Sequence, residues 1–241
     1  QLPLLREICR RLDGMPLALE MAAARVPVLG LVGLRDALEQ RFALLTTGRR
    51  DAAVRHRTLQ AALDWSHGLL APAEQRLFRI CGVFSGGFSL ELLVQVAAQP
   101  AGAADAAAQE SRWAVIDTLA NLMDCSLVGT DAGDPPRYAL LETMRDYARR
   151  RLAAGDDEAA LRSHHARALA ELAQRANAAG DSARALMLAE HDNLREAIAW
   201  ALANEPMRAV EMAIWVARVA RFSAWRHEAL RWLESCEAVV E

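Results

Sequence analysis

Apolar residues recur three and four positions apart along most of the chain, a spacing that predicts amphipathic helices. The first such pattern covers positions 4–12 and ends at Asp13-Gly14, a typical C-terminal cap. A second helix is expected to begin at Pro16, because a proline in the first turn needs no N–H donor. It is apolar on almost all sides through Ala24, which predicts burial. Leu34, Leu38 and Phe42 predict a third helix, before a polar, Arg-rich link at 46–57.

From position 58 to 152, the spacing of the apolar residues is helical at first and becomes typical of strands near the hairpin. Helical patterns start at Thr58 and Pro72, the turn 85–88 follows, and Ser89 is placed to cap another helix. The Ala-rich run 99–109 is expected to be a surface loop before an amphipathic helix around Trp113. Two short strands, 126–130 and 137–140, then flank a turn-rich segment, which predicts a β-hairpin. A charged helix at 142–152 completes the element order of a winged helix.

From position 156 onward the pattern is helical only. One helix is marked by apolar residues from 161 to 172 and a second by those from 186 to 202, with further patterns up to 233. Antiparallel helix pairs fit this spacing, without a strict repeat. The predicted fold is therefore mainly α. We expect a small helical domain at 1–55, a winged helix with one β-hairpin at 56–154, and an antiparallel helical bundle or the start of a TPR-like solenoid at 155–241.

Composition narrows the classes of protein. Of 241 residues, 53% are hydrophobic and 24% charged, with a net charge of -3, which excludes a disordered chain and a generally basic nucleic-acid binder. All 28 basic residues are arginine. Without lysine, the chain has no Schiff-base lysine, no lysine general base and no phosphate-loop lysine.

Cysteine usage and apolar run lengths predict a cytoplasmic protein. The four cysteines form no CxxC pair, which favours buried reduced thiols over a zinc site. No signal peptide is visible, and no run of about 18 uninterrupted apolar residues could span a bilayer. The chain begins with Gln1 inside an apolar pattern, so we expect it to be a fragment of a longer protein.

Several sequence blocks resemble one family when taken in order. The block Leu12-Asp13-Gly14-Met15-Pro16-Leu17-Ala18-Leu19 resembles the GxPLAL motif of the NB-ARC, or STAND, class of signal-transducing ATPases. The later blocks at 57–66, 84–88, 138–148 and 190–195 are similar to the bacterial transcriptional regulators of that class. The resemblance covers nearly the whole chain, and its specificity comes from the order and spacing of the blocks.

The resemblance implies that an ATPase core precedes this chain. No GxxxxGK[ST] loop is present, and the acidic magnesium-binding strand is missing as well. The chain is therefore expected not to be an enzyme by itself. ADP or ATP would bind the full-length protein, with no nucleotide held tightly by this fragment and no metal site.

The resemblance implies that this chain contributes half of a nucleotide site. The motif positions Gly14, Pro16 and Leu17 would face the adenine, the proline packing on it and the glycine allowing close backbone approach. In the family, a histidine at the strand-to-helix junction of the winged helix contacts the β-phosphate of ADP. Here Leu141 takes that position and offers no donor. Either another group, such as Arg57 or Arg55, replaces it, or ADP locking is weaker.

Each of these candidates has a plainer interpretation. Pro16 is also an ordinary helix-starting proline, and the cluster of arginines around Arg57 could be a solvated basic loop. The arginines of helix 142–152 fit a salt-bridged surface better than a nucleic-acid patch. The pair His164-His165 lacks a carboxylate at ligand spacing, and His165 falls on an apolar helix face. A buried histidine is therefore preferred to a metal ligand.

A winged helix also makes direct DNA binding a hypothesis to weigh. The exposed face of its third helix would present Asp117, Thr118, Asn121 and Asp124, and the wing tip adds Asp131 and Asp134. Acidic groups oppose the phosphate backbone, so a protein-facing winged helix is preferred.

Two functions remain open. The first is a regulatory fragment of a nucleotide-switched ATPase that controls transcription. Its partners would be the upstream ATPase core and a protein or small-molecule inducer at the helical region, with neither nucleic acid nor membrane bound directly. The alternative is a non-enzymatic helical scaffold that binds a protein or inducer without nucleotide.

Overall fold

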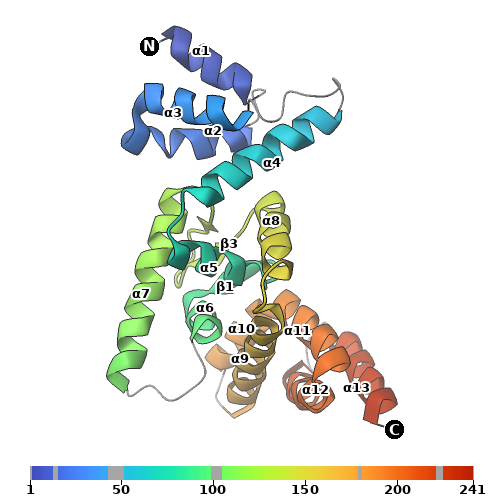
Figure 1. Cartoon of the computed structure of the whole chain (residues 1–241). Coiled ribbons are helices and arrows are strands. Elements are labelled where there is room, and N and C mark those ends of the chain that lie inside the picture. The colour runs from blue at the N-terminus through green and yellow to red at the C-terminus, as the bar shows by residue number, and fades with distance from the viewer. Residues whose placement is uncertain are drawn as a thin grey trace. The chain divides into compact units, whose positions relative to one another are not determined.

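The structure, a computed structural model, describes residues 2–12, 16–42, 52–98, 105–178, 181–220 and 225–240. The chain is mainly α-helical with one small sheet, as predicted (Figure 1). It divides into two compact units. The first contains Gln1–Phe78 and Asp117–Gly129, and the second contains Arg79–Ile116 and Thr130–Glu241. The three predicted domains are not delimited by this division and stay a prediction.

The first unit is built around four helices with a common apolar core. The helices are α1 (Leu2–Arg11), α2 (Pro16–Ala23), α3 (Val26–Phe42) and α4 (Ala52–Gly68). Ile8, Leu12 and Leu38 are buried in this core together with Trp65 of α4. Burying large apolar side chains of this kind contributes about 1.5–3 kcal/mol each. The fourth helix therefore packs with the three that the sequence assigns to a separate domain.

Helix α2 begins at Pro16 as predicted, but the expectation that it is buried all round is wrong. Ala18, Met21 and Ala22 are buried, whereas Pro16 and Ala23 are exposed. Helices α3 and α4 pack against α2 within this unit.

The segment Pro16–Leu38 is apolar and long enough to cross a membrane by composition alone. Its best 18-residue window has a mean hydropathy of 1.7, and 22% of that window is buried. The segment forms two helices separated by a turn at Ala24 and Arg25, with Gly30 at a φ of 66° inside α3. Core helices and signal sequences share this composition, and the cytoplasmic location stays a prediction.

Two predicted non-helical segments are partly helical. Helix α4 begins at Ala52, inside the expected link 46–57, and α7 (Asp105–Asp124) begins inside the expected loop 99–109. Both corrections have the same cause. Alanine has the highest helix propensity, and alanine-rich residues extend each helix towards its N-terminus.

The second unit holds the sheet, whose strand order is β1-β3-β2. The predicted hairpin is present as β2 (Gly129–Thr130) and β3 (Arg137–Ala139). A third strand, β1 (Gly87–Ser89), pairs antiparallel with β3, with Phe88 opposite Tyr138. The sequence predicts a turn at 85–88 instead of this strand, because a three-residue strand beside two glycines gives no alternation.

Two further helices of the second unit are α6 (Leu90–Ala97) and α8 (Glu142–Ala153), and α5 (Pro72–Cys81) passes from the first unit into the second. Ser89 caps α6 as predicted, and its Oγ accepts a hydrogen bond from the Leu92 N–H at 3.2 Å. The chain before β1 passes close to α8, where Gly82 lies against Ala148.

The rest of the second unit is a group of helices around one long central helix, α9 (Glu158–Ala178). The others are α10 (Asp181–Ala189), α11 (His191–Asn204), α12 (Pro206–Ala220) and α13 (Arg226–Val240). Helix α9 packs against α6, α10, α11 and α12, and α13 packs against α12. The single helix expected at 186–202 is in fact two, because the helical run breaks at Glu190.

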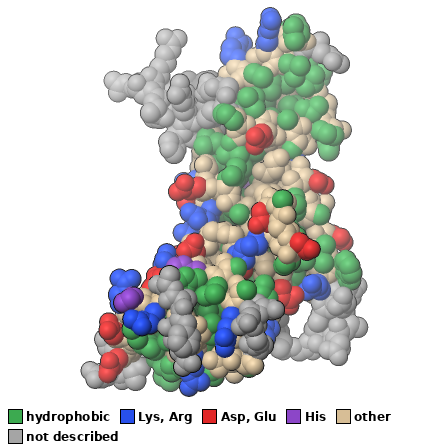
Figure 2. All heavy atoms as spheres, turned by 180° about the vertical axis from the view of Figure 1, so that it is seen from behind, with side chains coloured by type: hydrophobic (Ala, Val, Ile, Leu, Met, Phe, Trp, Pro, Cys, Tyr) green, Lys and Arg blue, Asp and Glu red, His purple; other side chains and the backbone are tan. Residues whose placement is uncertain are grey.

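Exposed apolar side chains lie on helices α1 and α3 of the first unit, and Figure 2 shows apolar side chains on the surface of this unit. The large ones are Leu2, Leu5, Val28 and Val32, of which Val28 is 81% exposed. A cluster of this kind marks an interaction surface more often than isolated exposed residues do.

The contact at Gly82 generates the first prediction. A Cβ added there would lie 2.8 Å from Ala148 Cβ and 2.9 Å from the Ala148 carbonyl carbon, so α8 would have to move. We expect Gly82→Ala to lower the free energy of unfolding by about 1–3 kcal/mol, measured by urea denaturation followed by circular dichroism.

Gly33→Ala is the matched control. The added Cβ would meet only Leu29 Cβ, at 3.6 Å, and alanine is favoured over glycine inside a helix by about 1 kcal/mol. Gly33→Ala should not destabilise the protein, and equal losses in both variants would contradict the packing argument.

Candidate functional site

The residues predicted to face the adenine lie at the start of α2. Pro16 occupies the first turn and is exposed, and Leu17 is half-buried. Gly14 lies outside the described residues. Arg57 falls within α4, but its side chain and that of Arg55 lie outside the described part.

Leu141 lies at the strand-to-helix junction, as predicted. It is the N-cap residue of α8, directly after β3 and Leu140, and its side chain makes no capping hydrogen bond. It is 58% exposed. Pro16 and Leu17 belong to the first compact unit and Leu141 to the second.

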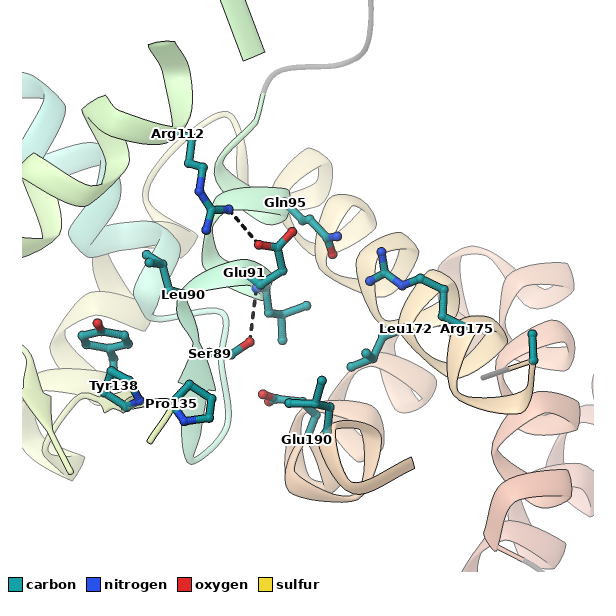
Figure 3. A pocket seen from close by; sticks show the side chains of 14 residues that line it. Ser89, Leu90, Glu91, Gln95, Arg112, Pro135, Tyr138, Leu172, Arg175 and Glu190 are labelled. Carbon is teal, nitrogen blue, oxygen red and sulfur yellow. Dashed lines mark hydrogen bonds and ion pairs between the residues drawn. The ribbon is translucent and has the colours of Figure 1, made fainter. Parts of the chain in front are cut away.

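A cavity of about 700 Å³ lies within the second unit (Figure 3). Its lining comes from the start of α6, from Arg112 of α7, from the end of the hairpin loop with β3, and from α9, α10 and Glu190. Leu90, Pro135, Leu172 and Leu186 are among its apolar walls. Its size falls in the usual range for small-molecule sites.

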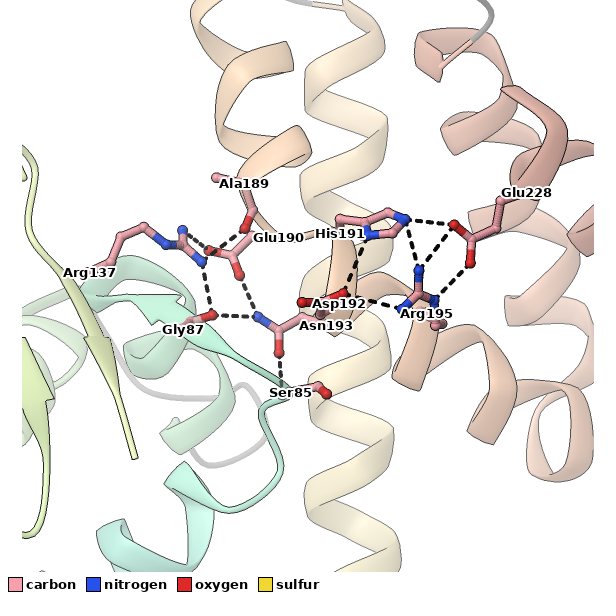
Figure 4. A network of polar contacts seen from close by, with 10 residues as sticks. All are labelled: Ser85, Gly87, Arg137, Ala189, Glu190, His191, Asp192, Asn193, Arg195 and Glu228. Carbon is pink, nitrogen blue, oxygen red and sulfur yellow. Dashed lines mark hydrogen bonds and ion pairs between the residues drawn. The ribbon is translucent and has the colours of Figure 1, made fainter. Parts of the chain in front are cut away.

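Glu190, which also lines this cavity, is a buried carboxylate at the break between α10 and α11. Its side chain is 2% exposed and accepts a hydrogen bond from Arg137 Nη1 at 2.7 Å (Figure 4). Arg137 is on β3, and its Nη2 also donates to the carbonyls of Gly87 and Ala189, at 2.9 and 3.0 Å. A buried carboxylate is tolerated when it is paired and hydrogen-bonded in this way.

Asn193, one turn along α11, completes the network. Its Nδ2 donates to Glu190 Oε2 at 2.5 Å and to the Gly87 carbonyl at 2.9 Å, while its Oδ1 accepts the Ser85 N–H at 2.7 Å (Figure 4). The side chain is 1% exposed. One of these bonds goes to the N-cap residue of the same helix, and the other two reach Ser85 and Gly87 in a distant segment of the chain.

These five residues, Ser85, Gly87, Arg137, Glu190 and Asn193, form what we call the junction network. It connects β1 and β3 with the start of α11, segments separated by about fifty to a hundred residues in the chain. Buried, fully satisfied polar networks hold their members in one geometry, because breaking any bond leaves a buried polar group without a partner. The network therefore fixes the sheet to the helical region.

A more exposed cluster lies at the other side of α11. Glu228 of α13 accepts hydrogen bonds from Arg195 Nε at 2.7 Å and pairs with His191 Nε2 at 2.8 Å. The hydrogen bond from Arg195 is the main cause of the lowered pKa of Glu228. The ring of His191 also lies 4.0 Å from that of Trp225, so this cluster connects α11 to the start of α13.

His165 is buried on the apolar face of α9, which confirms the sequence prediction. It is 2% exposed, and its ring meets the ring of Phe84 edge-on at 5.1 Å. Burial, with smaller contributions from Arg162 and Arg149, lowers the pKa of His165 to about 3. Within the ranges that the structure describes, no three His, Cys, Asp or Glu side chains form a group that could hold a metal ion.

The junction network was not predicted from the sequence. In the sequence, the block 190–195 carries only a family resemblance, and Arg137 is only part of an expected strand. A buried glutamate gives no periodic signal. Its partners come from two other segments, so the pairing appears only when the chain is folded.

Comparison with known proteins places this chain beside bacterial regulators. It is 40% identical, over 241 aligned residues, to "Putative HTH-type transcriptional regulator Rv0890c" of Mycobacterium tuberculosis strain H37Rv and to "Putative HTH-type transcriptional regulator Mb0914c" of Mycobacterium bovis. Each alignment covers 95% of this chain and 26% of the relative. The chain therefore spans about a quarter of the length of these relatives.

A second kind of relative is "Uncharacterized protein Rv0894" of Mycobacterium tuberculosis strain H37Rv, 37% identical over 157 residues. That alignment covers 64% of this chain and 38% of the relative. Neither a family model nor a solved structure gives a significant match. Of these relatives, the ones 40% identical to this chain carry names that describe them as HTH-type transcriptional regulators.

The junction network generates the second prediction. Asn193→Ala removes the acceptor of the Ser85 N–H and a donor to Glu190, leaving both buried groups short of a partner. We expect the free energy of unfolding to fall by about 2–3 kcal/mol in urea denaturation. Asn204→Ala, at an exposed asparagine of the same helix, is the matched control and should cost under about 0.5 kcal/mol. Similar effects of the two substitutions would show that the network does not stabilise the junction.

The third prediction concerns His165 and pH. The unfolded chain protonates this histidine near pH 6.5, whereas the folded state keeps it neutral down to about pH 3. Falling pH therefore favours the unfolded chain between these values, by about 2 kcal/mol at pH 5. In His165→Gln, the loss of unfolding free energy between pH 7 and pH 5 should be smaller by that amount.

His227→Gln replaces an exposed histidine of α13 and serves as the control for this measurement. It should retain the pH dependence of the unsubstituted protein. An unchanged pH dependence in His165→Gln would contradict the buried neutral state of that imidazole.

Proposed function

We propose that this chain is the regulatory part of a nucleotide-switched signal-transducing ATPase that controls transcription, and that it is not catalytic by itself. The observation that carries the proposal is the similarity of 95% of the chain to about a quarter of larger proteins named as transcriptional regulators. The nucleotide-dependent switch rests on the sequence blocks that resemble the NB-ARC class.

The residues of this chain fit the adenine of a nucleotide better than its phosphates. Pro16 is exposed in the first turn of α2, where its ring is free to pack on an adenine. Leu141 is exposed but has no donor for a phosphate, so it does not fit the role of the family's histidine. A bound nucleotide would supply binding energy that differs between two conformations. In this chain, the contribution would come from the α2 side.

An upstream ATPase core is the partner that we propose for the first unit. The exposed apolar residues over α1 and α3, among them Val28 and Val32, support this assignment. Covering such a surface would contribute roughly 25 cal/mol per Å² of apolar area removed from water. Release of the ATPase core in the other conformation would expose this apolar surface to water again.

The second unit would transmit the signal. The junction network joins the hairpin to the helical region through mostly part-buried hydrogen bonds around the buried side chains of Glu190 and Asn193, so these parts are expected to move together. An inducer that binds the helical region would thereby act on the hairpin and on α8, which directly follows it. In this proposal, the hairpin and α8 form an element with two conformations, and a ligand and a nucleotide would both shift the equilibrium between them.

Direct DNA binding by this chain is not proposed. Asp117, Asn121 and Asp124 are exposed on α7, and Asp131 and Asp134 are exposed in the hairpin loop. Two acidic segments would oppose the phosphate backbone. Transcriptional output would instead depend on a DNA-binding domain elsewhere in the full-length protein.

The alternative is a helical scaffold that binds a protein or inducer and uses no nucleotide. The cavity of about 700 Å³ in the second unit favours inducer binding and is compatible with either function. Nucleotide retention by the longer protein separates the two.

The fourth prediction tests the switch in the protein extended upstream of Gln1. It should contain GxxxxGK[ST] and co-purify with ADP, detected by chromatography of the released nucleotide. Loss of the Pro16 ring contact in Pro16→Ala should weaken ADP retention about tenfold.

Pro27→Ala is the control, because Pro27 is an exposed proline at the start of the next helix. It should retain ADP like the unsubstituted protein. An upstream sequence without the phosphate loop, or a purified protein without nucleotide, would contradict the switch and favour the scaffold.

A further inference from the structure

We propose that the cavity between α6, the hairpin and helices α9 and α10 binds a small amphiphilic anion, with an apolar body and one carboxylate. This deepens the proposed function, on which it rests, by naming the chemical class of the inducer and its site.

The walls fit an apolar body. Leu90 of α6, Leu172 of α9 and Leu186 of α10 line the cavity from three helices, and Pro135 closes it from the hairpin loop. Leu186 is 47% exposed, an unusual state for a leucine beside a cavity of this size. An apolar ligand would cover such side chains and gain roughly 25 cal/mol per Å² of area removed from water.

When the ion pairs of the lining are counted, one positively charged group remains unpaired. Glu91 is paired with Arg112 at 2.7 Å, and Glu190 is paired with Arg137 inside the junction network. Among the side chains that the structure describes, Arg175 of α9 has no hydrogen-bond or ion-pair partner. The lining therefore carries one uncompensated positive charge, which selects for an anion over a neutral or cationic ligand.

A second donor lies beside that charge. Gln95 of α6 is half-buried, and its side-chain amide has no hydrogen-bond partner among the described residues. Figure 3 shows Gln95 and Arg175 reaching towards one another from α6 and α9 at the same side of the cavity. A guanidinium and an amide N–H₂ facing one point can share the two oxygens of a carboxylate.

The position of the cavity connects the ligand to the proposed switch. Its lining comes from both sides of the junction network, and Glu190 belongs to the lining and to the network at once. A ligand in contact with Pro135 and Leu186 would hold the hairpin against α10. Occupancy would therefore favour the conformation in which the two are together.

The experiment uses the 241-residue chain and three probes with the same alkyl body: decanoate, decanol and decyltrimethylammonium. Isothermal titration calorimetry below micelle concentrations should give one decanoate per chain, with at least tenfold weaker binding of the other two. Arg175→Gln should weaken decanoate about tenfold and leave decanol unchanged. Arg231→Gln, at an exposed arginine of α13, should leave both unchanged.

A second variant tests the apolar part of the cavity. Leu186→Trp puts a larger side chain into the cavity from an exposed position. The circular dichroism spectrum and urea midpoint should therefore stay those of the unsubstituted protein. Binding of both decanoate and decanol should fall at least tenfold.

The proposal is overturned if decanoate shows no saturable binding, if decanoate and decanol bind equally, or if folded Leu186→Trp binds both probes unchanged. None of these measurements contains nucleotide. A failed ligand test therefore leaves ADP retention by the extended protein intact as evidence for the switch. Failed ADP retention likewise leaves the cavity as the site of the scaffold alternative.

Discussion

The arrangement of the second unit depends on one buried carboxylate. Glu190 is withdrawn from water at the break between two helices, and a charge in that position is unfavourable without a counter-charge and hydrogen bonds. Arg137 and Asn193 supply them, one from the sheet and one from the helix. The carboxylate therefore determines which strand lies beside which helix, whereas the leucines and alanines around it would accept several arrangements.

Function, in this view, is divided between the two units. The first presents an exposed proline and an apolar surface, which suit a nucleotide and a second domain. The second holds a cavity whose lining shares a residue with its polar junction. A regulator needs a part that receives a signal and a part that responds to it. In the second unit, the cavity would receive the signal and the hairpin would respond, and Glu190 belongs to the cavity lining and to the network that holds the hairpin. A ligand in the cavity would therefore change the balance between conformations.

The sequence predicts most of the helices and the hairpin because periodicity and caps are local signals. Pro16 at the start of α2, Ser89 as a cap and the buried His165 are all correct for that reason. The strand at Gly87, the break at Glu190 and the early starts at Ala52 and Asp105 are missed. The first two depend on partners far along the chain, and the last two depend on alanine continuing a helix into a segment that composition marks as a loop. Of the candidate site, Leu141 is placed correctly by its motif, but the cavity and the junction network have no counterpart in any local pattern.

The three bonds of Arg137 have a consequence for how the short sheet is aligned. Strand β3 has only three residues, and its pairing with β1 could slide at little cost if the ladder alone held it. Side chains alternate between the faces of a strand, so a slip of one residue would turn the guanidinium to the opposite face. Glu190 would then remain in the interior with no cation beside it. A charge outside the sheet thus selects its register, and lysine, with its single ammonium, lacks the forked donors that reach the carboxylate and two carbonyls together.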